Sequence, residues 1–252
     1  TYTTMAERLR GVERAVIPGF YGSMPNDTIR TFSRGGSDIT GAIVARATGS
    51  DLYENWTDVS GVLMADPRIV EDPEVIDIIT YNELRELSYM GATVLHEDAI
   101  FPVRLMGIPI NIRNTNKPED PGTMIVASAE GAGKNVITGI AGKPGFSSIT
   151  IEKDMMNSEV GFTRKVLSVL ESEGISFEHM PSGIDTLSII LATPVLEGKK
   201  ERILRAICDA VSPDSVFVED SIALIAVVGR GMRSTKGTAA RTLDAVADAG
   251  IN

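Results

Sequence analysis

The sequence predicts an α/β protein in two parts, a mostly parallel sheet with its helices followed by ferredoxin-like βαββαβ units. From residue 51 to residue 127, short apolar runs typical of strands alternate with stretches whose apolar residues recur at helical spacing. From residue 136 onward the expected order becomes strand, helix, strand, strand, helix, strand. A segment of small residues at 129–135 separates the two patterns and marks the best domain boundary.

The elements of the first part follow from local signals. Thr80 and Glu83 form a capping-box pair, which predicts that a helix begins there. Apolar residues at helical spacing after Asp38 predict another helix, and Pro102 kinks or interrupts a third. Isoleucine recurs at every second position of the strand at 108–112, which predicts one buried face. The expected elements are a helix ending near 14, a buried strand at 16–22, the helix after 38, strands at 51–59 and 75–79, helices at 80–90 and 94–106, and strands at 108–112 and 123–127.

The second part contains one complete unit and the beginning of a similar one. The complete unit is expected to have strands at 136–140, 148–152, 175–179 and 186–192, with helices at 161–173 and 199–211. A new cycle then opens with a strand at 221–228 and a helix at 236–249. One strand and one helix cannot bury both faces, so we expect this last unit to be truncated.

Composition narrows the class of protein. The chain has 252 residues, 43% of them hydrophobic and 23% charged, as is ordinary for a soluble globular protein. Its net charge of −10, with no basic stripe, argues against a nucleic-acid partner. The single cysteine, Cys208, lies in an amphipathic run and is expected to be a small buried hydrophobe. Without disulfides, signal peptide or an apolar run of roughly 20 residues, we expect a cytoplasmic protein with no membrane partner. His96 and His179 are isolated, so no metal site is expected.

The candidate ligand site is the octet 33–40, Ser-Arg-Gly-Gly-Ser-Asp-Ile-Thr, directly before a helical pattern. Arg34 offers a planar fork suited to a carboxylate or phosphate, and the helix N-terminus adds partial positive charge. Gly35 and Gly36 permit positive φ and close approach of a ligand to the backbone. Ser37 or Asp38 can cap the helix, and the acid supplies the charge needed for an ammonium group. The octet by itself is also compatible with a capped helix and a surface arginine.

Five motifs in order resemble the aspartate kinases of the amino acid kinase family. They are Gly-Phe-Tyr-Gly at 19–22, Arg-Gly-Gly-Ser-Asp at 34–38, Trp-Thr-Asp-Val at 56–59, Ala-Asp-Pro-Arg at 65–68 and Gly-Ala-Thr-Val-Leu-His at 91–96. Their order and spacing match the second half of the family's kinase domain. The later units look like the paired ACT regulatory domains found downstream in that family.

The resemblance implies an enzyme that uses ATP to phosphorylate the side-chain carboxylate of L-aspartate, giving 4-phospho-L-aspartate. This reaction is the entry to lysine, threonine and methionine biosynthesis. By the same resemblance, Arg34 would clamp the α-carboxylate of aspartate and Asp38 would hold its α-ammonium group. The other residues that would contact this substrate are Ser37, the backbone of Gly35 and Gly36, and Phe20 as a wall.

The resemblance also implies a nucleotide site. Thr57 and Asp58, at the C-terminal end of a strand, would hold the base and ribose of ATP, where open α/β sheets bind ligands. Arg68 would meet a phosphate, with Asp66 fixing its loop. Mg²⁺ would arrive with ATP, bound mostly through phosphates and water.

The sequence departs from the family pattern at several places. Leu63 stands where the family often has a tyrosine near the nucleotide, and it can only pack. Thr93 stands where the family often has a lysine, so it keeps a hydroxyl but loses the charge. The family's Lys-x-Gly-Gly phosphate loop and a substrate-site glutamate are absent from this sequence. We therefore expect a chain truncated at both ends that contains no catalytic residue and is inactive alone.

The resemblance assigns the domains and a regulatory site. The expected domains are the C-terminal part of the kinase domain at 1–128, a linker with the first regulatory strand at 129–145, a first ACT domain at 146–219 and a partial second one at 220–252. A feedback amino acid, lysine or threonine, would bind across a homodimer formed through the ACT domains. The residues expected to bind it are Met156, Asn157, Ser158, Gly161, Phe162, Ser176, Phe177 and Glu178. The alternative is a core lined by methionine and phenylalanine, with Glu178 simply solvated.

Two other functions remain open at this point. A non-catalytic amino-acid-sensing subunit would explain the missing phosphate loop. A kinase of the same family acting on another small acid would share the motifs, although Asp38 argues against substrates whose amine is blocked.

Overall fold

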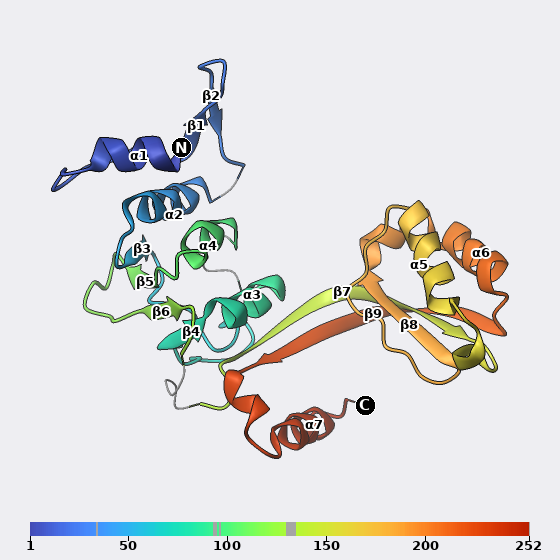
Figure 1. Cartoon of the computed structure of the whole chain (residues 1–252). Coiled ribbons are helices and arrows are strands. Elements are labelled where there is room, and N and C mark those ends of the chain that lie inside the picture. Colours follow the sequence, from blue (N-terminus) through green and yellow to red (C-terminus); the bar gives the residue numbers. More distant parts are fainter. Residues whose placement is uncertain (34, 93–94, 96, 130–134, 252) are drawn as a thin grey trace. The chain divides into compact units, whose positions relative to one another are not determined.

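The computed structural model describes residues 1–33, 35–92, 95, 97–129 and 135–251 (Figure 1). The chain divides into two compact units, one formed by Thr1–Ala141 with Ile225–Asn252 and the other by Gly142–Leu224. The two-part α/β fold predicted from the sequence is confirmed. Among the described helices, none is long and apolar enough to cross a membrane.

The first unit is built on a four-stranded mixed sheet. The strand order is β3 (Tyr53–Thr57), β5 (Ile110–Asn114), β6 (Thr123–Val126), β4 (Ile78–Thr80). The outer pairs β3–β5 and β4–β6 are parallel, and the central pair β5–β6 is antiparallel. Its helices are α1 (Tyr2–Leu9), α2 (Gly36–Thr48), α3 (Tyr81–Tyr89), α4 (Glu97–Arg104) and α7 (Thr238–Asp248), with the 3₁₀ turn η3 (Arg230–Arg233).

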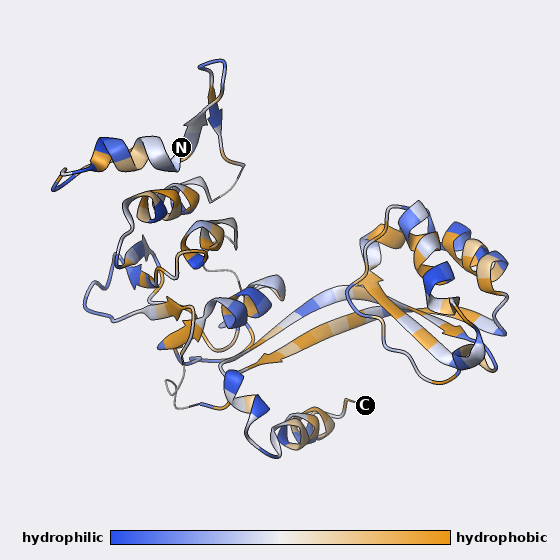
Figure 2. Cartoon of the chain, viewed as in Figure 1, coloured by the Kyte–Doolittle hydropathy of each residue, from blue (hydrophilic) through white to orange (hydrophobic). Residues whose placement is uncertain are grey.

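Most of these elements begin where local signals predict. The capping box is confirmed, because Thr80 Oγ1 accepts a hydrogen bond from Glu83 N (3.3 Å) and Glu83 Oε2 accepts one from Thr80 N (2.9 Å). The helix expected at 94–106 is α4, and Pro102 lies within it. The strands β4 and β6 are strongly hydrophobic (Figure 2), and Ile79 and Ile125 have no exposed surface.

Two expectations for the first unit are wrong. The run 16–22 is not a buried strand, since Val16 is fully exposed and the strand that forms is β1 (Tyr21–Ser23), paired with β2 (Ile29–Thr31) as an exposed hairpin. Pro18 has no N–H to donate, and Phe20 adopts a left-handed φ of 78°, so the run cannot continue a sheet ladder. The strand at 108–112 does not have a single buried face. Asn111, on the opposite face from the isoleucines, is 8% exposed and therefore buried as well.

The second unit packs two helices against an antiparallel arrangement of strands. Its elements are β7 (Gly139–Glu152), the 3₁₀ turn η1 (Met156–Ser158), α5 (Phe162–Ser172), β8 (Thr186–Ala192), the 3₁₀ turn η2 (Thr193–Leu196), α6 (Lys200–Val211) and β9 (Ser215–Val228). The strand order is β8-β7-β9, and α5 and α6 cover one face (Figure 1). The segment 178–182 continues the order along the outer edge of β8 through isolated bridges.

Three details differ from the sequence pattern. The strands expected at 136–140 and 148–152 are one long strand, β7, and the strand expected at 175–179 is reduced to the bridges of 178–182. Cys208 is exposed rather than buried. The buried stripe of α6 is Ile203, Ile207 and Val211, and Cys208 follows Ile207 by one position, which rotates it about 100° away from the core. The domain bounds expected at 145 and 219 stay predictions, and both fall within strands that run on unbroken.

Candidate functional site

The octet forms the N-terminus of α2. The helix begins at Gly36, and Gly35 is its N-cap with φ 60° and ψ 25°, a left-handed conformation that glycine adopts without steric cost. The expectation that Ser37 or Asp38 caps the helix is wrong, because no described side chain caps it and Asp38 already lies in its first turn. There its negative charge still favours the positive end of the helix. Arg34 lies outside the described residues.

The Asp38 carboxylate is held by neighbouring strand β3. Asn55 Nδ2 donates to Asp38 Oδ1 (3.1 Å) and to the Tyr53 hydroxyl (3.0 Å), and that hydroxyl donates to the backbone oxygen of Asp38 (3.2 Å). Asn55 is 8% exposed. Burial raises the pKa of Tyr53, so its hydroxyl stays protonated and remains a donor. Sequence reasoning missed Asn55 and Tyr53, although polar residues at alternate positions of a strand beside the octet are a signal that could have found them.

Phe20 is fixed against the same helix start. Its backbone N donates to Thr40 Oγ1 (3.1 Å), and its backbone O accepts from Phe32 N (3.0 Å). A Cβ atom at Gly36 would lie 2.9 Å from Phe20 Cδ2, so only glycine permits this approach. The positive φ of Phe20 is uncommon for a bulky residue, and such strain is often found at ligand sites. The structure therefore brings Phe20, Gly36 and Asp38 to one end of α2.

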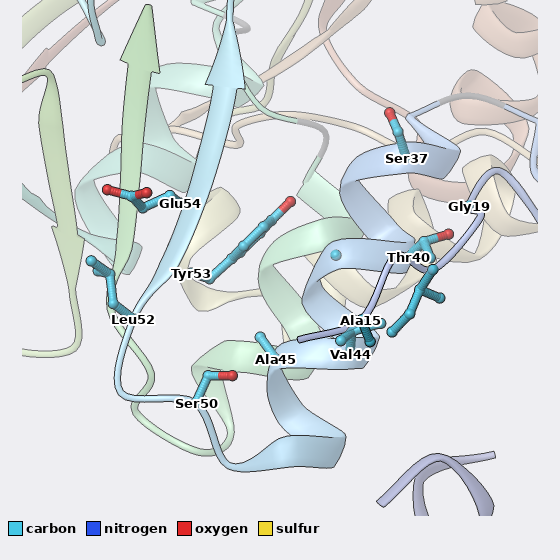
Figure 3. Close-up of a pocket in the computed structure, with 12 residues that line it drawn as sticks. Ala15, Gly19, Ser37, Thr40, Val44, Ala45, Ser50, Leu52, Tyr53 and Glu54 are labelled. Carbon is cyan, nitrogen blue, oxygen red and sulfur yellow. The ribbon is translucent and has the colours of Figure 1, made fainter. Parts of the chain in front are cut away.

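A pocket of about 410 Å³ opens beside this helix (Figure 3). Residues of α2, of the segment 15–19 and of the beginning of β3 line it. Of the predicted substrate residues that the structure describes, Ser37 alone lines this pocket. The predicted set is thus gathered at the end of α2 rather than inside this pocket.

The predicted nucleotide residues follow β3. Thr57 is the last residue of β3, and its backbone O accepts from Thr115 N (2.8 Å) just beyond the end of the parallel neighbour β5. Thr57 Oγ1 lies 3.2 Å from Asp58 Oδ1, and Asp58 is exposed. The carboxyl ends of both strands therefore meet at one edge, as a ligand site of this fold class requires.

Asp66 orients Arg68. The Asp66 carboxylate accepts hydrogen bonds from Arg68 Nε (2.9 Å), Nη2 (2.6 Å) and backbone N (2.9 Å), and these lower the pKa of Asp66 to about 2. The Arg68 side chain is 83% exposed, so its charge is presented to solvent in a fixed direction. Leu63 is half-buried and bridges to Val75, which agrees with a packing role. Thr93 lies outside the described residues.

The predicted effector residues form two groups within the second unit. The register places Glu178 beside Ile190, which pairs with Ser148, whereas the segment 156–162 follows Glu152. The two groups therefore lie toward opposite ends of the sheet. Met156 and Phe162 belong to the core, in agreement with the alternative interpretation for these two side chains.

Of the remaining predicted effector residues, most are exposed to solvent and one lies at a helix N-terminus. Asn157, Ser158, Ser176 and Phe177 are exposed, and Gly161 is the N-cap of α5 with φ 81°. Phe162 N donates to the backbone oxygen of Glu159 (3.3 Å), and among the described residues no side chain caps the remaining N–H groups of the first turn of α5.

Comparison with known proteins points to one family. Residues 2–114 match the amino acid kinase family. Aspartokinase 3 of Bacillus subtilis is 44% identical over 247 residues, which make up 97% of this chain and 54% of that protein. The chain therefore spans about half the length of the curated relative it matches.

Solved structures give the same result. An aspartate kinase of Clostridium acetobutylicum is 56% identical, with a TM-score of 0.89 over 98% of this chain and 57% of that one. E. coli aspartokinase III in complex with aspartate and ADP is 25% identical, with a TM-score of 0.69 over 90% of this chain and 51% of that one. The same protein in complex with lysine and aspartate is 28% identical, with a TM-score of 0.61 over 84% of this chain and 47% of that one.

Proposed function

We propose that this chain, whose residues 2–114 match the amino acid kinase family, is part of an aspartate kinase that phosphorylates the side-chain carboxylate of L-aspartate with ATP. The observation that carries the proposal is the start of α2, where a left-handed glycine, a strained phenylalanine and a braced acid come together. A similar E. coli protein binds aspartate and ADP.

The amino acid would be held at both ends of its zwitterion. Arg34 would pair with the α-carboxylate, helped by the partial positive charge of the α2 N-terminus. Asp38, braced by Asn55, would accept hydrogen bonds from the α-ammonium group. Ser37, at the exposed start of the helix, would contact the same ligand, and Phe20 would wall it. This grip leaves the side-chain carboxylate pointing away from the helix toward the nucleotide.

The nucleotide would lie at the carboxyl end of β3. Thr57 and Asp58 would hold base and ribose, and Arg68 would neutralise phosphate charge. In the transfer, an oxygen of the aspartate side chain forms a bond to the γ-phosphorus while the bond to the β-γ bridging oxygen breaks, which gives 4-phospho-L-aspartate and ADP. Mg²⁺, carried by the ATP phosphates and water, would supply further charge neutralisation. We assign no residue of this chain to a catalytic role in that step.

Regulation would reside in the second unit. We propose that a feedback amino acid, lysine or threonine, binds there between two copies of the chain. The separation of the two effector groups within one copy supports a shared site. E. coli aspartokinase III has been solved with lysine bound, which favours this class of ligand.

The assay uses the full-length protein that carries this chain, with L-aspartate, Mg-ATP and hydroxylamine, which traps the acyl phosphate as a hydroxamate. We expect hydroxamate formation that depends on aspartate and ATP, and its loss in Arg34→Ala. Binding of lysine or threonine without hydroxamate would instead support the non-catalytic sensing subunit. Hydroxamate formed with another small acid but not with aspartate would support a different kinase of the family.

A further inference from the structure

We propose that Asn55 and Tyr53 are positioning residues that hold Asp38 for the ammonium group of the substrate, an inference that rests on the proposed function. Both lie on β3 and face α2, since residues two apart in a strand share a face. Figure 3 shows the Tyr53 ring reaching from β3 toward α2, while Glu54 points away from the helix. Thr57 continues the same row toward the proposed nucleotide site.

The hydrogen bonds fix the carboxylate from one side. A side-chain amide nitrogen has two N–H donors, and Asn55 directs one to Asp38 Oδ1 and the other to the Tyr53 hydroxyl. Among the described residues, the hydrogen bonds to this carboxylate end on Oδ1, so Oδ2 is left for a donor on the ligand. An aspartate in the first turn of a helix would otherwise exchange among rotamers, and the ligand would have to order it on binding.

Gly41 of α2 leaves space for the side chain of Tyr53. Glycine in a helix interior is destabilising relative to alanine, yet Gly41 lies in the middle of α2. A Cβ atom there would lie 2.6 Å from the Tyr53 hydroxyl oxygen and 2.8 Å from the ring. The missing side chain therefore makes room for Tyr53, whose hydroxyl reaches the backbone oxygen of Asp38.

The consequence is selectivity for an acid with a free α-amino group. A braced Asp38 favours a ligand with N–H donors, because its Oδ2 gains no hydrogen bond from a ligand that lacks an amine. Removing the hydrogen bonds that hold Asp38 should weaken the binding of aspartate. The same change should not affect the binding of succinate, a dicarboxylic acid of the same length that lacks the amine.

The test measures steady-state kinetics of the full-length protein with Asn55→Ala, Tyr53→Phe and Gly41→Ala. Each should raise KM for aspartate, by about 10-fold for Asn55→Ala, with less than about a twofold change in KM for ATP. The inhibition constant of succinate, measured as a competitor of aspartate, should stay the same. Glu54→Gln, on the opposite face of the strand, is the matched control and should leave KM for aspartate unchanged.

The outcomes separate this inference from the proposed function. If the unaltered protein phosphorylates aspartate but the three variants keep its KM, the positioning role is wrong and the proposed function stands. A parallel loss of aspartate and succinate affinity would likewise overturn the role, because it would indicate general disruption. If the unaltered protein makes no hydroxamate from aspartate, both are overturned. Circular dichroism checks that each variant folds. If Asn55→Ala does not fold, Tyr53→Phe, which keeps the aromatic ring, serves for the same test.

Discussion

Replacing Glu83 should destabilise the first unit far more than replacing Glu86, an exposed acid on the same helix. The Glu83 side chain is 8% exposed and accepts hydrogen bonds from three separate segments. They come from Thr80 N (2.9 Å) and Oγ1 (2.7 Å), from Thr138 Oγ1 (2.7 Å), and from Arg230 N (3.1 Å) and Nη1 (3.0 Å). This carboxylate therefore joins the start of α3 to the residues before β7 and after β9.

The magnitude follows from the pKa of Glu83. Burial alone would raise it, but the hydrogen bonds from Thr138, Thr80 and Arg230 outweigh burial and lower it from 4.5 to about 2. A shift of this size corresponds to about 3 kcal/mol of folding stability. Since the folded-state pKa is the lower one, this contribution is complete above the unfolded-state pKa near 4.5 and is lost as pH falls toward 2. Glu83→Ala, which also removes the side-chain half of the capping box, should cost about 3–5 kcal/mol at pH 7.

Urea denaturation followed by tryptophan fluorescence measures the effect. Trp56 is the single tryptophan of the chain and lies in β3, so its emission reports on the first unit. We expect a large loss for Glu83→Ala, and a loss for Glu83→Gln that shrinks as pH is lowered from 7 to 3. Glu86→Ala should change stability by less than about 0.5 kcal/mol. Equal losses for Glu83→Ala and Glu86→Ala, or a Glu83→Gln cost that is the same at both pH values, would refute this reasoning.

Two further predictions use the first unit. Gly122→Ala should destabilise the protein by several kcal/mol, because φ is 72° and the new Cβ would lie 1.8 Å from the backbone oxygen of Ile112. Gly49→Ala, with φ 63° and open space around it, should cost about 1 kcal/mol. Thermal unfolding compares the two variants, and equal costs would show that the contact with Ile112 is unimportant. Arg68→Ala should raise the pKa of Asp66 from about 2 toward its ordinary 3.8, because Arg68 supplies the hydrogen bonds that lower it. Carbon-detected NMR titration of Asp66 measures this pKa. An unchanged value would mean that another group holds the carboxylate.

Local signals were sufficient where short-range physics decides the structure. The capping box of Thr80 and Glu83 involves residues three apart, so the start of α3 could be read directly. The glycine pair before Asp38 likewise predicted a turn with positive φ, and Gly35 has it. The ordered motifs predicted a resemblance to the aspartate kinases, and residues 2–114 match the amino acid kinase family.

Long-range contacts were not predictable in the same way. The run at 16–22 looked apolar enough for a core strand, yet only its end joins a strand, in the exposed β1–β2 hairpin. Cys208 looked buried, but its position on α6 places it outside the core. Asn55 reaches Asp38 across 17 positions, and Glu83 reaches Arg230 across 147. Such pairs are set by how helices and strands pack, and one sequence does not record which polar residues will meet.

The amino-acid sequence by itself therefore determined where most helices and strands form and which proteins the chain resembles, because periodicity, caps and ordered motifs are properties of neighbouring residues. Only the tertiary structure decided which side chains brace Asp38 and what surrounds Glu83. A hydrogen bond depends on ångström-scale distances between segments remote in the chain, and those distances exist only after the sheet and helices have packed.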